Sequence, residues 1–128
     1  MSLNDKAVTR LTSGLQRFDD YGLSTYIEVS ADLRSGDQAV LKANVLFVDA
    51  SELYIRMFYL GGRANTLLSY AYQYQREDGT LVFRYDNARH KPELGFDCHK
   101  HQADGKIVAA PPPRIEDLVQ EVIDHVTS

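Results

Sequence analysis

Five runs rich in β-branched and aromatic residues follow one another through the middle of the chain, and short turn-forming segments separate them. The turn at Asp78-Gly79 is the clearest, because a type I′ turn needs positive φ at both central positions, which aspartate tolerates and glycine adopts freely. Strands joined by such short connections pair with their neighbours in the chain. The sequence therefore predicts an antiparallel meander of about five strands, over residues 26–33, 39–48, 53–60, 67–76 and 80–85.

Two helices are expected outside these runs. The first has apolar residues three or four positions apart, which define one helical face, at Val8, Leu11, Leu15 and Phe18. Gly22 is placed to end it. The second follows three prolines and has the same spacing at Ile115, Leu118, Val119, Val122, Ile123 and Val126. We predict a single α+β domain over residues 1–128, with an N-terminal helix and a C-terminal helix packed on the sheet.

Charge and cysteine content exclude several classes of function. Cys98 is the only cysteine, so the chain cannot form an internal disulfide or a zinc finger that needs several thiolates. The formal net charge is −4 at pH 7, which does not favour nonspecific binding of duplex nucleic acid. No apolar run approaches the ~20 residues that cross a bilayer, and no signal-peptide pattern begins the chain. We therefore expect a cytoplasmic protein without membrane contact.

Tyrosine occupies every second position in part of the fourth run, at Tyr70, Tyr72 and Tyr74. Since side chains alternate along a strand, the three rings share one face of the sheet. Two interpretations are open: the rings pack in the core, or they form a platform on which nucleobases stack. Packing is the commoner use of aromatic side chains, and three rings alone do not identify an RNA-binding protein.

Three of the four histidines fall between residues 84 and 101, and the sequence predicts a loop over residues 87–103. Imidazole exchanges protons near neutral pH and is also the commonest metal ligand. Cleavage of RNA without a metal needs groups that take and give protons, and cations that stabilise charge at phosphorus. The region supplies proton carriers at His90, His99 and His101. It supplies cations at Arg84, Lys91 and Lys100.

The spacing of these residues leaves three interpretations open. In an extended segment His99 and His101 would point to one side and Lys100 to the other, and Asp86 could orient a ring for acid–base catalysis. Alternatively, two imidazoles at i and i+2 with a third nearby can bind zinc, and Asp86 or Asp97 could complete the ligand set. Against a zinc site, the sequence has no H-E-x-x-H motif or Cys/His array. The third interpretation is that the histidines are ordinary loop residues, satisfied by backbone groups and water.

The chain contains the run RYDNARH at residues 84–90 and HKH at residues 99–101. These elements resemble the signature of the TumE-like family of small toxins from prokaryotic toxin–antitoxin systems, in which RYDNaPHH is followed by HkH. The matching residues are Arg84, Asp86, Asn87, His90, His99 and His101. Met57 stands where a glutamate is expected; Arg89, Lys91 and Asp97 stand where a proline, a histidine and a proline are expected. The resemblance, over about residues 24–126, implies a growth-inhibiting toxin with ribonuclease activity that a DNA-binding antitoxin holds inactive.

The leading hypothesis is therefore a TumE-like toxin that cleaves RNA by acid–base catalysis, with no metal and no other cofactor. Its catalytic residues are His90, His99, His101 and Asp86, with His90 and His99 exchanging protons. Its substrate-binding residues are Arg84, Asn87, Lys91 and Lys100. The alternative is a catalytically silent module that binds a protein partner on the same scaffold. Under either hypothesis, an exposed strand edge would allow the chain to form a homodimer.

Overall fold

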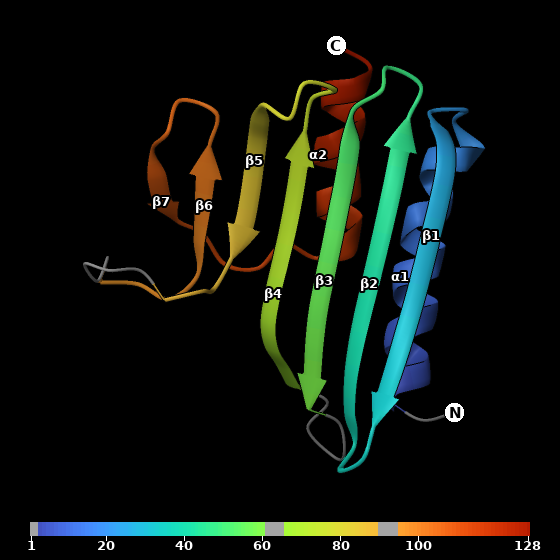
Figure 1. The fold of residues 1–128 in the computed structure, drawn as a ribbon, viewed down its shortest axis with the longest axis vertical. Coiled ribbons are helices and arrows are strands. Elements are labelled where there is room, and N and C mark those ends of the chain that lie inside the picture. The colour runs from blue at the N-terminus through green and yellow to red at the C-terminus, as the bar shows by residue number, and fades with distance from the viewer. Residues whose placement is uncertain (1–2, 61–65, 90–94) are drawn as a thin grey trace.

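A computed structural model describes residues 3–60, 66–89 and 95–128 of the chain. In these residues two helices, α1 (Leu3–Asp20) and α2 (Ile115–Val126), stand before and after a run of seven strands. The strands form one sheet (Figure 1). Their bounds are β1 (Ser24–Arg34), β2 (Gln38–Phe47), β3 (Glu52–Leu60), β4 (Thr66–Gln75), β5 (Leu81–Asp86), β6 (His99–Gln102) and β7 (Ile107–Ala109).

The strands pair in the order of the chain, from β1 at one edge to β7 at the other, and each neighbouring pair is antiparallel. The α+β class, both helices and the antiparallel meander are confirmed. The expected number of about five strands is wrong, because β6 lies inside the predicted loop and β7 follows it. These strands have only four and three residues, too few for an alternating pattern to be recognised.

An Asp-Gly turn joins β6 to β7. Gly105 has φ 86°, and the Gln102 N–H donates to the Lys106 carbonyl oxygen at 2.8 Å. The Asp104 carboxylate accepts a hydrogen bond from the Lys106 N–H at 2.9 Å, which fixes the turn. The same dipeptide joins β4 to β5, so a signal for the additional hairpin is present in the sequence.

Both helices lie on one face of the sheet, behind it in Figure 1, and leave the other face open. The predicted apolar face of α1 is buried, since Leu11, Leu15 and Phe18 are at most 1% exposed. The chain leaves α1 where Gly22 adopts φ 68°. The residues of α2 that are fully buried are Leu118, Val119 and Val122. In the described residues, neither helix is long and apolar enough to cross a membrane.

The tyrosine row of β4 faces the helices. Tyr70, Tyr72 and Tyr74 are 5%, 1% and 2% exposed and belong to the hydrophobic core. The packing interpretation is confirmed, and the stacking platform is wrong for these rings because nucleobases cannot reach them. Since side chains alternate, Ala71 and Gln73 face the other side of the sheet. β4 therefore packs one face against the helices and turns the other, more polar face away from them.

Candidate functional site

The face of the sheet that carries no helix, called the open face below, brings together residues from β5 and β6. Alternation places Arg84 and Asp86 on this face of β5, and His99 and His101 on the same face of β6. The register sets Asp86 opposite His99 and Arg84 opposite His101. Four predicted site residues therefore meet, and we call them the Asp86 cluster.

Asp86 is the centre of this cluster, and its side chain is 4% exposed. Its Oδ2 accepts a hydrogen bond from Arg84 Nε at 2.6 Å and lies 3.6 Å from His101 Nε2. Its Oδ1 faces His99 Nε2 at hydrogen-bond distance and accepts from the Ala88 N–H at 3.2 Å. Burial alone would raise the pKa of Asp86, but the Arg84 hydrogen bond and the charge of His99 outweigh it, so the pKa lies below its ordinary value. The carboxylate is therefore charged at neutral pH.

The two histidines differ in their access to solvent. The His99 side chain is 1% exposed, and its Nδ1 lies 2.9 Å from the Asp97 carbonyl oxygen. Both ring nitrogens of His99 therefore face oxygen acceptors, which fixes the orientation of the ring. The His101 side chain is 23% exposed, and its ring centroid lies 5.0 Å from that of His99. Of these two imidazoles, His101 is the one that a ligand can reach.

Lys100 points to the opposite side of the sheet, as alternation predicts. Its Nζ donates to Glu121 Oε2 on α2 at 2.7 Å and lies 4.9 Å from the centroid of the Tyr85 ring. Burial alone would lower the pKa of Lys100, but hydrogen bonds with Glu121 and Tyr85 raise it above its ordinary value. The structure does not bring Lys100 to the two histidines, and the lysine instead ties β6 to α2.

The remaining predicted site residues are Asn87, His90 and Lys91. Asn87 follows β5 directly; its Oδ1 accepts from the Tyr70 N–H at 3.2 Å, and its Nδ2 donates to the Leu68 carbonyl oxygen at 3.0 Å. These bonds extend the contact between β4 and the end of β5, so Asn87 anchors the segment that leaves the cluster. His90 and Lys91 lie outside the described residues.

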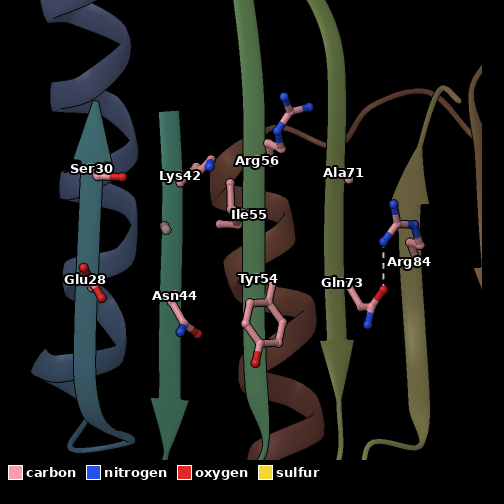
Figure 2. Close-up of a pocket in the computed structure, with 11 residues that line it drawn as sticks. Glu28, Ser30, Lys42, Asn44, Tyr54, Ile55, Arg56, Ala71, Gln73 and Arg84 are labelled. Carbon is pink, nitrogen blue, oxygen red and sulfur yellow. Dashed lines mark hydrogen bonds between the residues drawn. The ribbon is translucent and has the colours of Figure 1, made fainter. Parts of the chain in front are cut away.

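A groove of about 510 Å³ crosses the open face and reaches the Asp86 cluster (Figure 2). Three cationic side chains line it: Lys42, Arg56 and Arg84. Arg84 Nη1 donates to Gln73 Oε1 at 2.8 Å, the bond drawn as a dashed line in Figure 2. The same guanidinium binds Asp86 through Nε. The groove and the cluster therefore share Arg84 and form one continuous surface.

Sequence reasoning missed the groove residues on β2 and β3. Lys42 and Arg56 are distant from the histidines along the chain, and only the register of the sheet brings them into line with the cluster. The available signal was the pair of polar residues two positions apart within each strand, Lys42 with Asn44 and Tyr54 with Arg56. This pattern indicates a shared face but not which other strands complete it.

Comparison with known proteins identifies the family. Residues 15–128 match the family described as Toxin TumE. The chain belongs to the TumE toxin family. The match covers all strands of the sheet and α2, and it confirms the resemblance inferred from the residues around the histidines. The chain is thus the toxin component of a toxin–antitoxin system, which implies an antitoxin partner. No curated protein and no solved structure matches the chain.

The structure shows how two departures from the TumE-like pattern lie relative to the Asp86 cluster. Met57 stands where a glutamate is expected, but it is 4% exposed and lies in the core, opposite Tyr70 on the helix-covered face. A carboxylate there would not face the Asp86 cluster, so Met57 removes no group from it. Asp97 stands where a proline is expected, and its contact with the cluster is a backbone carbonyl, which a proline would also supply.

The Asp86 cluster also has the donor set of a metal site. One ligand atom each from Asp86, His99 and His101 lies within 4.8 Å of the others, and two imidazoles with a carboxylate suit zinc or a similar ion. Against this, the Arg84 guanidinium already occupies Asp86 Oδ2 and would repel a second cation. Arg84 therefore disfavours a metal ion at this carboxylate oxygen.

Proposed function

We propose that this TumE family toxin cleaves RNA by acid–base catalysis at the Asp86 cluster, without a metal. The observation that supports the proposal is the convergence of an accessible imidazole on His101, a buried carboxylate on Asp86 and the guanidinium of Arg84 at one end of the groove. A proton carrier, a group that stabilises its charged form and a cation for phosphate are three of the parts that the reaction requires.

His101 is the proton carrier closest to the substrate in this proposal, because it is more exposed than His99. The charged Asp86 carboxylate lies 3.6 Å from His101 Nε2 and stabilises the positive charge that the ring acquires. His99 is a positioning residue, since its ring fixes the other oxygen of the carboxylate. This assignment differs from the hypothesis based on the sequence, in which His99 itself exchanges protons.

The cleavage step needs a second proton carrier and stabilisation of the phosphate charge. One imidazole removes the proton of the 2′-hydroxyl, O2′ bonds to phosphorus, the P–O5′ bond breaks, and another imidazole gives its proton to O5′. Arg84 has donors left for the phosphate, since a guanidinium carries five N–H groups and its side chain is 36% exposed. His90 as second proton carrier and Lys91 as phosphate ligand rest on the sequence alone.

The substrate in this proposal is RNA. The protein partner is a DNA-binding antitoxin, as the TumE-like resemblance implies. β1 is an edge strand of 11 residues, and its backbone groups offer a place where a strand of another chain can pair. A homodimer would use the same edge.

Incubation of the purified toxin with a single-stranded RNA oligonucleotide tests the proposed activity. We expect cleavage by the wild type and a loss of about 100-fold or more in rate for His101→Ala. His125→Ala is the matched control, because His125 lies on α2 with its ring 5.8 Å from that of Tyr74, away from the open face. A chelator should leave the rate unchanged.

Two outcomes would count against this activity. Equal rates for the wild type and His101→Ala would remove the Asp86 cluster from the mechanism. Absence of cleavage by a folded wild-type protein would favour the alternative, a catalytically silent module that binds a protein partner.

A further inference from the structure

We propose that the groove on the open face binds single-stranded RNA and guides it across the sheet to His101. This inference rests on the proposed ribonuclease function and adds the form of the substrate and the surface that holds it. Figure 2 shows the side chains of Lys42, Arg56 and Arg84 on the side of the sheet away from the helices. Because none of these cations comes from β6, their contribution to RNA binding can be tested without changing the histidines.

The register arranges the open face in two parallel rows that end at the histidines. One row consists of Lys42, Arg56, Ala71, Asp86 and His99. The other consists of Asn44, Tyr54, Gln73, Arg84 and His101. Neighbouring strands lie about 4.8 Å apart, so the four intervals from β2 to β6 span roughly 19 Å. A chain of several nucleotides laid across the strands would therefore reach from the first cation to His101.

Lys42 and Arg56 are exposed, and neither forms an ion pair with any other described residue. Arg84, by contrast, is held by Asp86 and Gln73. The first two cations are therefore available to phosphate groups, and the third is oriented next to the proposed cleavage site. Phosphate contacts by lysine and arginine supply most of the sequence-independent affinity for nucleic acid.

The groove suits a single strand better than a duplex. Tyr54 is 39% exposed, and in its row it lies between the amides of Asn44 and Gln73. An aromatic ring on an open sheet face stacks on an unpaired base, and amides bind base edges that a duplex would hide. A duplex also presents a denser phosphate charge, whereas this chain has a net charge of −4 and, among the described residues, only three cations line the groove.

Fluorescence anisotropy with a labelled single-stranded RNA tests the inference in the His101→Ala background, where cleavage does not consume the probe. Adding Lys42→Ala and Arg56→Ala should raise Kd by about tenfold or more and reduce its salt dependence. With three phosphate contacts the slope of log K against log salt is about −2, and with one contact about −0.7. The matched control is Lys6→Ala with Arg10→Ala, which removes the same charge from exposed positions on α1.

Tyr54 gives a second, independent arm of the same test. Tyr54→Ala should weaken binding by about tenfold through the loss of base stacking, and Tyr54→Phe, which keeps the ring, should bind as the parent protein does. A duplex of the same RNA sequence should bind more weakly than the single strand. Circular dichroism and thermal unfolding verify that each variant is folded.

The results separate this inference from the proposed function. Groove variants that bind RNA as tightly as the α1 control, or equal affinity for duplex and single strand, would overturn the inference even if the wild type cleaves RNA. Binding that depends on the groove in a protein that does not cleave RNA would instead reject the catalytic proposal and leave the binding surface in place.

Discussion

The two faces of the sheet are made by the same strands, yet they carry different kinds of side chain. On the helix-covered face, Phe47, Tyr72 and Phe83 are each 1% exposed and form the core with the helices. On the open face, Lys42 and Arg56 are exposed to solvent. The difference follows from the two-residue period of a strand, which divides each segment between packing and solvent. Most of the stability should therefore come from one face, while the other is available for binding.

The Asp86 cluster is an exception on the open face, because the side chains of Asp86 and His99 are only 4% and 1% exposed. Charged groups that are removed from water interact more strongly than charged groups on the surface, and they cost more when one partner is lost. The comparison therefore predicts that substitutions of exposed residues on the open face have little effect on stability, whereas substitutions at the buried β5–β6 pair have a larger one.

The largest expected effect contrasts two phenylalanines on opposite faces of neighbouring strands. Phe47 on β2 packs edge to face against Phe18, with ring centroids 4.8 Å apart, whereas Phe58 on β3 is half-buried on the open face. Phe47→Ala should lower the free energy of unfolding by about 3–5 kcal/mol. Phe58→Ala should lower it by about 1 kcal/mol. Urea denaturation measures both, and equal losses would break the distinction between the faces.

A smaller effect, with a characteristic dependence on pH, is expected at Asp86. Asp86→Asn removes a charged acceptor from Arg84 and His99 and should cost about 2 kcal/mol at neutral pH. Because the pKa of Asp86 is lowered in the folded state, its stabilising contribution is present above the unfolded pKa and is lost as the pH falls through the folded value. The difference between wild type and variant should therefore shrink below about pH 4.

Urea denaturation of both proteins between about pH 3 and pH 7 checks the Asp86 prediction. A difference that stays constant over this range would mean that the carboxylate contributes no charge-dependent stability. Glu28→Gln is a suitable control, because Glu28 is an exposed carboxylate that lines the far end of the groove on β1.

The longer elements could be predicted from the sequence because their patterns repeat several times. The apolar spacing in α1 and α2 and the alternating runs of β1 to β5 all correspond to elements of the structure. β6 and β7 could not be recognised in this way, since their register depends on pairing with β5 rather than on a periodic pattern of their own. Only the Asp-Gly turn between them gave a local signal.

Within the site, local spacing predicted which side chains share a face, and tertiary pairing decided the rest. Residues two apart, such as His99 and His101, had to point the same way if the segment was extended. That Asp86 lies opposite His99, and that His99 is buried while His101 is accessible, follows from the β5–β6 pair and its surroundings. The contributions of Lys42 and Arg56 depend on three strand registers and could not be derived from spacing along the chain.

The smallest effect in this series concerns a single methyl group on the helix-covered side. A Cβ atom at Gly14 of α1 would lie 2.4 Å from Ile115 Cγ2 of α2, so the helices are in close contact at this glycine. Gly14→Ala gains up to about 1 kcal/mol of helix propensity but costs about 1–3 kcal/mol in overpacking. We expect a net loss of about 1 kcal/mol in the free energy of unfolding.

A double-mutant cycle identifies the cause of that loss. Ile115→Ala removes the Cγ2 atom, so Gly14→Ala in this background should stabilise the protein by about 0.5–1 kcal/mol through helix propensity alone. A methyl group added on the open face by Ser30→Thr, at an exposed position of β1, should change stability by less than about 0.5 kcal/mol. Gly14→Ala could instead have the same effect with and without the Ile115 side chain. In that case the close contact between the helices would not be what excludes a side chain at position 14. Packing on the covered face would then be less restrictive than the comparison of the two faces requires.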